Sequence, residues 1–427
     1  MRERVPRQSD RDGEGDRVGG SGLPTKKLLD GNHAAAYGAK LARAEVLGIY
    51  PITPQTELAN QLADFVASGE MKAKYITVES EHSAMSVCAG GSAAGARVFT
   101  ASSSQGIVFM EELLWQVPGM RLPVVMGIVN RSIAFPGSLR PDHNDSLLQR
   151  DNGWIQIYCE NAQEIIDACI QAYRIAEDSR VYLPVIFAYD GYVISHTAMP
   201  VEVPDQDDVD RFLPPYKHEY VYLDPKRYKP VITHEPFQEL GVEYRYQMEE
   251  AQNQARHVIK EVDREYGKIF GRSYGGLIEK YRCEDARAVL VTMGSITGTA
   301  RVVVDEMRND GKPIGLVKLR VFRPFPVEEM QELGRSVKAI GFVDRNISHG
   351  SAGGGVGTVE TARALYSLEV RPVLIGFYAG LVGRDVLPSD IRYMAERVLR
   401  AAETGKPEKQ VEWIGLRKQA EQVQVKV

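Results

Sequence analysis

Four short segments of the sequence carry residues that could bind and activate a small molecule. Each begins where an apolar run gives way to small or polar residues. They are residues 50–55 (YPITPQ), 78–83 (VESEHS), 99–106 (FTASSSQG) and 129–132 (VNRS). In an alternating β/α chain such places are the carboxyl ends of strands, where open α/β sheets bind ligands. The sequence therefore predicts one site assembled from four separate segments.

The second segment supplies two carboxylates, Glu79 and Glu81. Glu81 begins a predicted helix rich in Ala, Ser and Gly, so its side chain can enter a partly apolar pocket. Burial raises the pKa of a carboxyl group and lets it share a proton with a ring nitrogen. The alternative is a carboxylate that only interacts favourably with the helix dipole.

Residues 102–106 (SSSQG) offer hydroxyl and N–H groups at a predicted strand-to-helix turn. Such a turn suits an anion or the polar edge of a ring, and an ordinary capping turn is the alternative. No Gly-Lys-Ser/Thr follows, so it is not a Walker loop. Residues 353–357 (GGGVG) precede a later predicted helix, where glycines could serve a phosphate or close helix packing.

Arg131 follows an apolar predicted strand and faces the same end of the sheet as Thr53 and Glu81. A guanidinium group there suits a carboxylate ligand, with a surface salt bridge as the alternative. Thr53 lies between two prolines, in a backbone that cannot be helical. Residues 142–145 (DHND) suggest a metal site or a general base. Three of these four are also favoured helix-capping residues, and no second His stands at ligand spacing, so we expect no metal there.

Length and composition indicate a globular protein of two domains. The chain has 427 residues, 44% hydrophobic and 26% charged, with a formal net charge of -5. That charge gives no support for nucleic-acid binding, and no apolar run approaches the roughly 18 residues of a membrane helix. The N-terminus lacks the apolar core of a signal peptide, so we expect a cytoplasmic protein. The four cysteines form no C-x-x-C pair, so we expect no iron–sulfur cluster in this chain.

Predicted strands and helices alternate along most of the chain, which favours α/β domains with parallel sheets covered on both faces. Residues 1–27 are polar and read as a disordered tail. Residues 28–198 form a first α/β domain, and 199–270 an extended arm followed by a helix. Residues 271–403 form a second α/β domain, and 404–427 a polar tail.

The start of the first domain has a specific prediction. Apolar residues at helical spacing predict a helix over residues 32–47, with Asn32 as its cap. Gly48 ends it, and a short strand begins at Ile49.

An ordered set of motifs resembles the alpha subunit of the multi-subunit 2-oxoacid:ferredoxin oxidoreductases, and is most similar to pyruvate:ferredoxin oxidoreductase alpha subunits. The resemblance covers about residues 29–399. Its motifs are residues 31–37 (GNHAAAY), 50–55 (YPITPQ), 79–83 (ESEHS), 103–106 (SSQG), 142–145 (DHND), 149–154 (QRDNGW), 190–191 (DG), 271–275 (GRSYG), 344–348 (DRNIS) and 383–385 (GRD).

The resemblance implies an enzyme whose thiamine diphosphate site is split between chains. The first domain would be a pyrimidine-type parallel-sheet domain, and the second a transketolase C-terminal-like α/β domain. A beta subunit would bind the diphosphate and Mg²⁺, and gamma- and delta-type subunits would carry iron–sulfur clusters. The complex would convert a 2-oxoacid, pyruvate first, and coenzyme A to acyl-CoA and CO₂, with electrons passing to ferredoxin.

The resemblance also implies residue roles. Glu81 would face N1′ of the aminopyrimidine, so that the 4′ nitrogen can remove the C2 proton of the thiazolium. Arg131 would pair with the oxoacid carboxylate, and Thr53 would hydrogen-bond its carbonyl or carboxylate. Further cofactor contacts are expected at Pro51, Ile52, Ser104 and Gln105.

Two departures from the family pattern bear on the substrate. His33 stands where close family members often have Glu, and residues 139–141 (LRP) replace an Ile-Trp-Asn-like stretch. A bulkier 2-oxoacid such as phenylglyoxylate is therefore the alternative substrate class, and NAD as final acceptor belongs to that alternative. Two other classes remain open: a non-catalytic scaffold, and a transketolase- or decarboxylase-like enzyme without electron transfer.

Overall fold

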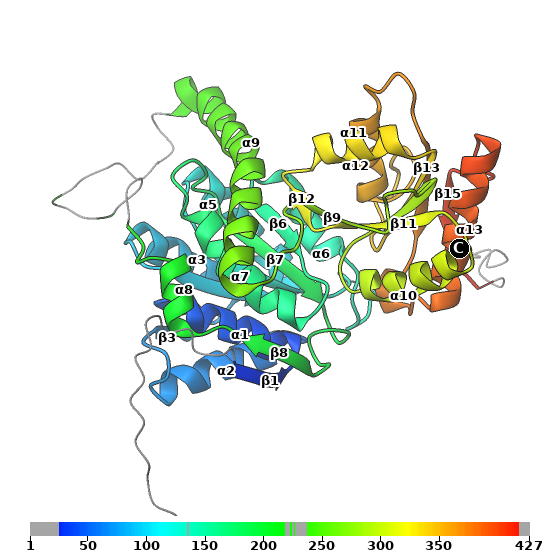
Figure 1. Cartoon of the computed structure of the whole chain (residues 1–427). Helices are drawn as coiled ribbons and strands as arrows, with labels where there is room; N and C mark the ends of the chain where they lie inside the picture. Colours follow the sequence, from blue (N-terminus) through cyan, green and yellow to red (C-terminus); the bar gives the residue numbers. More distant parts are fainter. Residues whose placement is uncertain (1–24, 135, 218–222, 224–225, 227–236, 418–427) are drawn as a thin grey trace, which may run out of the picture.

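The computed structural model describes residues 25–134, 136–217, 223, 226 and 237–417 of the chain. Its described part contains two α/β domains side by side, coloured blue to green and yellow to red in Figure 1. Each is built on one largely parallel sheet. The predicted α/β class with parallel sheets is therefore confirmed.

The first sheet has seven strands in the spatial order β12-β6-β7-β5-β4-β2-β3. All neighbours are parallel except β12 against β6. The strands are β2 (Val46–Gly48), β3 (Lys74–Ile76), β4 (Val98–Ser102), β5 (Val125–Asn130), β6 (Ile155–Tyr158), β7 (Val185–Asp190) and β12 (Val321–Arg323). Strands β4 to β7 are buried along their whole length, as parallel strands covered on both faces must be.

Helices cover both faces of this sheet. Those of the first domain are α1 (Gly31–Leu41), α2 (Thr56–Ala67), α3 (Glu81–Ala93), α4 (Gln105–Phe109), α5 (Glu111–Gly119), α6 (Asn144–Leu147) and α7 (Ala162–Ala176), with the 3-10 turn η1 (Leu148–Asp151). One hydrophobic cluster joins α1, α2 and α7 to the sheet, and a second joins α3 and α5 to the opposite face.

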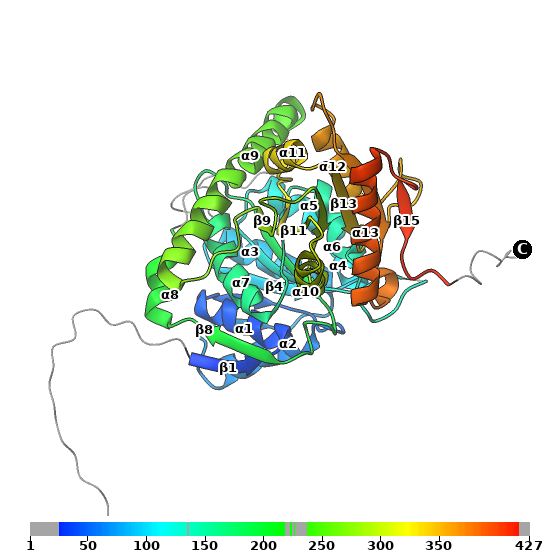
Figure 2. The same cartoon turned by 45° about the vertical axis from the view of Figure 1, so that its right-hand side comes forward.

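The second sheet has six strands in the order β15-β14-β13-β10-β11-β9, with only β9 antiparallel. The strands are β9 (Ile278–Tyr281), β10 (Ala288–Thr292), β11 (Ile314–Leu319), β13 (Ala339–Asp344), β14 (Val373–Tyr378) and β15 (Val411–Trp413). The helices are α10 (Ile296–Asn309), α11 (Val327–Ser336), α12 (Val356–Leu365) and α13 (Pro388–Thr404), with the turn η2 (Leu381–Gly383). Figure 2 shows α13 and β15 along the outer side of this domain.

The two domains share a core. The cluster behind α3 and α5 continues into the second domain through residues such as Phe322 and Met330. Strand β12 lies in sequence between elements of the second domain, but it pairs with β6 and completes the first sheet. A buried carboxylate of α7, Glu164, accepts from Lys318 at 2.5 Å and from Arg320 at 3.1 Å. The second domain is therefore part of what holds the first sheet in place.

The expected arm contains regular structure. Strand β8 (Met199–Val203) pairs antiparallel with β1 (Thr25–Leu29), and the pair lies beside α1 in Figures 1 and 2. Helix α8 (Gln206–Phe212) follows β8, and α9 (Phe237–Phe270) packs against α7. Most of 218–236 lies outside the described residues, as does the tail up to residue 24.

Several predicted boundaries are wrong. Residues 25–27 belong to β1, not to a tail, and 199–212 form β8 and α8. Residues 411–413 of the expected polar tail form β15, because Val411 and Trp413 pair with β14. The predicted helix over 32–47 ends at Leu41, and the strand predicted to begin at Ile49 is wrong, because the strand here is β2, Val46–Gly48.

Asn32 does not cap that helix. Asp30 is the cap, and its carboxylate accepts from the backbone N–H of His33 at 2.9 Å. No helix in the described part of the chain is long and apolar enough to cross a membrane.

Candidate functional site

The four segments picked out in the sequence meet at one edge of the first sheet. Thr53 follows β2, Glu81 follows β3, Ser104 follows β4 and Arg131 follows β5. These four strands are consecutive neighbours in the order β5-β4-β2-β3. Because the strands are parallel, their carboxyl ends open on the same side.

Glu81 is the first residue of α3 and only 6% exposed. The capping bond of that helix comes from Ser80, whose Oγ accepts from the N–H of Ser83 at 3.3 Å. Within the described ranges, no hydrogen bond or ion pair engages the Glu81 carboxylate. Ser80 therefore makes the capping hydrogen bond, and Glu81, as the acidic residue of the first turn, still meets the helix dipole favourably.

Gly106 lies directly against that carboxylate. A Cβ atom on Gly106 would stand 2.6 Å from Oε1 of Glu81 and 2.3 Å from Oγ of Ser102. Both separations are far below van der Waals contact, so no other residue fits here without moving Glu81 or Ser102. Sequence reasoning marked the SSSQG turn but missed this role, because the contact joins residues 25 positions apart.

The turn before Gly106 is strained and internally held. Ser104 is buried at φ 50°, a region that residues with a side chain seldom adopt. Its Oγ donates to the carbonyl of Ser132 at 2.7 Å, which ties the turn to the end of β5. The hydroxyls of Ser102 and Ser103 are buried and have no partner in the described structure. Gln105 is exposed beside them.

Arg131 reaches across the strand ends to the 50–55 loop. Its Nη1 donates to the carbonyl oxygen of Thr53 at 2.9 Å, and its buried Nε has no partner among the described residues. No ion pair of the described structure includes Arg131, so the surface salt-bridge alternative is not observed. Thr53 and Pro51 are exposed, and Ile52 is half-buried.

The side chain of Asn32 holds the 50–55 loop in place. Its buried side chain donates to the carbonyl of Pro54 at 2.8 Å and accepts from the Tyr189 hydroxyl at 2.9 Å. Pro54 also packs on Gly191, where a Cβ would stand 2.6 Å from its ring. Asn32 is thus a support residue that sequence reasoning took for a helix cap. The sequence feature that could have revealed this role is a polar residue next to the alanines of a helix face that is buried.

Residues 142–145 connect the two domains. Nε2 of His143 lies 2.9 Å from Oδ1 of Asp190, and both side chains are fully buried. Asp190 also accepts from the N–H of Ser295 and pairs with Arg345 of the second domain, each at 2.9 Å. Burial opposes the charge on Asp190, but Arg345 and His143 hold its pKa well below the usual range. The described residues contain no group of three or more His, Cys, Asp or Glu placed to hold a metal ion.

The glycine-rich stretch of the second domain surrounds an internal carboxylate. Asp344 accepts from the backbone N–H groups of Gly355, Gly357 and Thr358 at 2.9–3.2 Å. A Cβ on Gly355 would stand 2.4 Å from Cγ of Asp344. The donors that a phosphate would need are therefore already used, which favours the close-packing alternative for residues 353–357.

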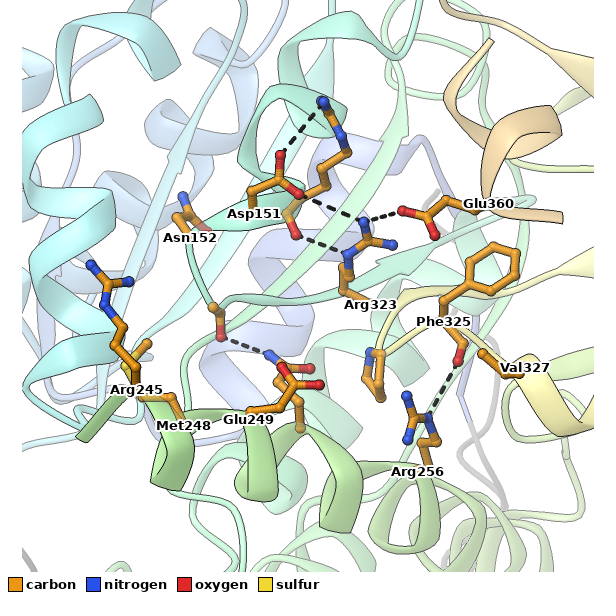
Figure 3. Close-up of a pocket in the computed structure, with 14 residues that line it drawn as sticks. Asp151, Asn152, Arg245, Met248, Glu249, Arg256, Arg323, Phe325, Val327 and Glu360 are labelled. Carbon is orange, nitrogen blue, oxygen red and sulfur yellow. Dashed lines mark hydrogen bonds and ion pairs between the residues drawn. The ribbon is translucent and has the colours of Figure 1, made fainter. Parts of the chain in front are cut away.

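Thr53, Glu81 and Arg131 line none of three hollows found in the described structure, two of which lie near the domain boundary. One, of about 680 Å³, is mostly apolar and lies between the domains, with Val108 and Ile133 on one wall and Tyr378 and Trp413 on the other. The second, of about 510 Å³, is shown in Figure 3. Helix α9 forms its floor, and Arg323 spans its centre to Glu360.

The residues at the sheet edge fit the aminopyrimidine end of thiamine diphosphate. The ring requires a carboxylate that is free to share a proton, and Glu81 is nearly buried and unengaged. Gly106 lets the Glu81 carboxylate lie directly against the turn, and the unpaired hydroxyls of Ser102 and Ser103 are polar groups beside it that a ring edge could bind.

Comparison with known proteins gives two family matches. Residues 37–264 match the family described as "Pyruvate flavodoxin/ferredoxin oxidoreductase, thiamine diP-bdg", and 286–391 match "Pyruvate:ferredoxin oxidoreductase core domain II". The pyruvate synthase subunit PorA of Methanothermobacter thermautotrophicus is 46% identical over 92% of this chain and 99% of its own. The ketoisovalerate oxidoreductase subunit VorA of Pyrococcus horikoshii is 44% identical over 92% and 99%.

A solved structure agrees in fold. The 2-oxoglutarate:ferredoxin oxidoreductase from Magnetococcus marinus superposes with a TM-score of 0.66 at 17% identity, covering 88% of this chain and 65% of that one. At that identity the likeness shows the fold alone. The family matches and the full-length relatives carry the assignment, and they agree with the resemblance seen in the motifs. This chain belongs to the 2-oxoacid:ferredoxin oxidoreductases, as an alpha subunit with a thiamine-diphosphate-binding domain.

Proposed function

We propose that this subunit supplies the pyrimidine half of a thiamine diphosphate site that oxidatively decarboxylates a 2-oxoacid, with pyruvate as the preferred substrate. The products are acyl-CoA, CO₂ and two electrons, which pass to ferredoxin or a similar acceptor. The observation that carries the proposal is the nearly buried, unengaged carboxylate of Glu81 against Gly106, at the same strand ends as Arg131 and Thr53.

Each residue has one task in this proposal. Bound thiamine diphosphate supplies the carbon that attacks the 2-oxo group. Glu81 holds a proton against N1′ of the pyrimidine and so makes the 4′ nitrogen basic. Arg131 pairs with the carboxylate of the 2-oxoacid through the guanidinium edge not used by Thr53. The Thr53 hydroxyl orients the oxo group. Pro51, Ile52, Ser104 and Gln105 line the pyrimidine side.

The remaining parts of the site belong to other chains. The relatives are named as subunits of their enzymes. We infer a beta subunit that binds the diphosphate and Mg²⁺, and gamma- and delta-type subunits with iron–sulfur clusters. The isolated chain should then bind thiamine diphosphate weakly. Tight, Mg²⁺-dependent binding by the isolated chain in calorimetry would overturn the split site.

A second substrate class has its own support. Identity is 46% to the pyruvate synthase subunit and 44% to the ketoisovalerate oxidoreductase subunit. Sequence similarity therefore does not decide between an oxoacid with a methyl group and one with a branched group. The loop that contains the departure at residues 139–141 is closed by a hydrogen bond from the N–H of Ser132 to the carbonyl of Arg140 at 3.1 Å. A bulkier 2-oxoacid, phenylglyoxylate included, is the alternative. NAD as final acceptor belongs to that alternative.

The deciding experiment is a substrate panel. The purified complex is assayed with coenzyme A against pyruvate, 2-oxoisovalerate, phenylglyoxylate and 2-oxoglutarate, with viologen dye and then NAD as acceptor. We expect the highest kcat/KM for pyruvate, with dye. A single extra methylene changes kcat/KM by about 10–200-fold in a shaped apolar pocket, so the ranking will be clear. Absence of turnover with every oxoacid, in a complex with bound cofactor, would favour a scaffold. Turnover without iron or dye reduction would favour a simple decarboxylase.

A further inference from the structure

Asp145 contacts both the turn after β4 and the end of β5 through a single side-chain oxygen. Its Oδ2 accepts from the backbone N–H of Ser104 at 3.0 Å and from that of Arg131 at 2.9 Å. Its Oδ1 accepts from the side chain of Asn130 at 2.7 Å and from the N–H of Ser146 at 2.8 Å. All four donors lie within or beside the candidate site, and Asp145 itself is fully buried.

These contacts account for a conformation that is otherwise costly. Ser104 stands at φ 50°, and such a residue persists only when its surroundings fix it. The hydrogen bond from its N–H to Asp145 and that from its Oγ to the carbonyl of Ser132 supply this fixing. Gly106, two residues further on, then meets the carboxylate of Glu81. Asp145 and Ser132 thus both hold the turn that lies against Glu81.

The second hydrogen bond of this oxygen, from the N–H of Arg131, concerns the part of the site proposed to bind the oxoacid. Within the described structure, the side chain of Arg131 has one hydrogen-bond partner, the backbone carbonyl of Thr53. Its backbone is fixed at the N–H by Asp145, and that of Ser132 by the carbonyl of Arg140. Burial raises the pKa of Asp145 to about 7, against the effect of the hydrogen bonds from Asn130, Ser104 and Arg131. The surrounding donors therefore offset the desolvation cost of this carboxylate only in part.

We propose that Asp145 is a positioning residue that couples the two halves of the site: it sets the Arg131 guanidinium against the 2-oxoacid and the Ser104–Gly106 turn against Glu81. The inference rests on the proposed function of Arg131 and Glu81. An Asp is required because both of its oxygens must accept. An Asn at this place presents an NH₂ group either to the N–H groups of Ser104 and Arg131 or to those of Asn130 and Ser146.

The test is Asp145→Asn in the complete complex. We expect KM for the oxoacid to rise roughly tenfold or more, because the site arginine loses its fixed position. Hydrogen–deuterium exchange at C2 of the bound cofactor should slow as well. A merely structural role would lower the fraction of active enzyme and leave KM and the exchange rate per occupied site unchanged.

Two comparisons isolate the coupling. Asp142→Asn is the matched control, because Asp142 is a buried carboxylate of the same segment that accepts from Asn144 and Val382 rather than from the site. It should leave KM and C2 exchange unchanged. In an Arg131→Ala background, Asp145→Asn should raise KM no further, since residues that act through one another are not additive. An equal rise in both backgrounds would overturn the coupling to Arg131.

The outcomes separate this inference from the proposed function. If Arg131→Ala leaves KM unchanged, the role of Arg131 is wrong, and C2 exchange still tests the effect of Asp145 on the turn. If Arg131→Ala raises KM and Asp145→Asn changes neither readout, the inference is wrong. Should Asp145→Asn not fold, Asn130→Ala removes one donor and keeps the carboxylate. It should raise KM a few-fold, and an unchanged KM would contradict the proposal.

Discussion

The Arg131 guanidinium donates to the Thr53 carbonyl across 2.9 Å, and thereby links the ends of β5 and β2 over the intervening β4. This contact uses Nη1 of the guanidinium, Nε is buried, and no hydrogen bond or ion pair among the described residues uses Nη2. It holds the charged group over the strand ends, where a 2-oxoacid would have to lie to meet both Arg131 and a cofactor beside Glu81.

Arg131→Ala should therefore weaken oxoacid binding and leave thiamine diphosphate binding near normal. A hydrogen bond to a charged group is worth about 1.5–3 kcal/mol, or roughly 10–150-fold in KM. Steady-state kinetics with saturating cofactor measure the effect. Arg180→Ala is the control, because Arg180 is an exposed arginine paired with Asp178 and Glu261. Normal substrate kinetics combined with loss of cofactor would refute the assignment.

Gly106→Ala should impair the cofactor half of the site without unfolding the chain. The added methyl group would overlap the carboxylate of Glu81 and the hydroxyl of Ser102, so one of them must move. We expect weaker thiamine diphosphate binding and slower C2 exchange in the complex. Gly90→Ala in the same α3 is the matched control, because no atom lies within 4 Å of its added Cβ. The control should keep activity and stabilise α3 by about 0.5–1 kcal/mol.

The layout of the site was predictable from the sequence because it depends on local signals. The four segments that end apolar runs do lie at the carboxyl ends of β2, β3, β4 and β5, because each run that ends at small or polar residues contains a strand. Parallel pairing then placed the four strand ends together without knowledge of any long-range contact. The family motifs added the identity of the cofactor.

What could not be predicted depends on contacts between distant residues. Strand β12 has three residues, and only its pairing with β6 makes it a strand. The apolar residues up to Leu47 keep the helical spacing of α1. The sequence alone therefore cannot show that Val46–Gly48 forms a strand of the sheet. In the same way, the roles of Gly106 and Asp145 follow from partners that local patterns do not reveal.

Asp190→Asn should loosen the contact between the two domains. Its carboxylate pairs with Arg345 in full burial, and removal of one partner of a buried pair costs about 3–5 kcal/mol. Denaturant unfolding followed by hydrogen exchange in residues 142–147 and 344–348 measures the loss. Glu306→Gln, at a half-exposed pair with Arg392, is the control and should cost under about 1 kcal/mol. Equal losses of unfolding free energy in both variants would show that Asp190 does not hold the two domains together.

The same group gives a pH dependence with a definite sign. The pKa of Asp190 is lowered on folding, so the unfolded chain binds a proton more readily. Its contribution to the free energy of unfolding is present above the ordinary pKa near 3.8 and is lost as the pH falls below it. Asp190→Asn should therefore flatten the fall in stability between about pH 5 and pH 3. A fall as steep as that of the wild-type protein would show that Asp190 does not contribute.

Glu81→Gln tests the central claim most directly. Glutamine keeps the size of the side chain but cannot share an acidic proton with N1′, so the fold should survive while C2 activation falls by about 10²–10⁴-fold. Hydrogen–deuterium exchange at C2 of the bound cofactor measures this step in the complex without knowledge of the substrate. Glu79→Gln is the matched control, since Glu79 is exposed and bonded to Ser83, and its exchange rate should equal that of the wild type. An exchange rate within a few-fold of wild type for Glu81→Gln, at full cofactor occupancy, would contradict the account and move the activating acid elsewhere.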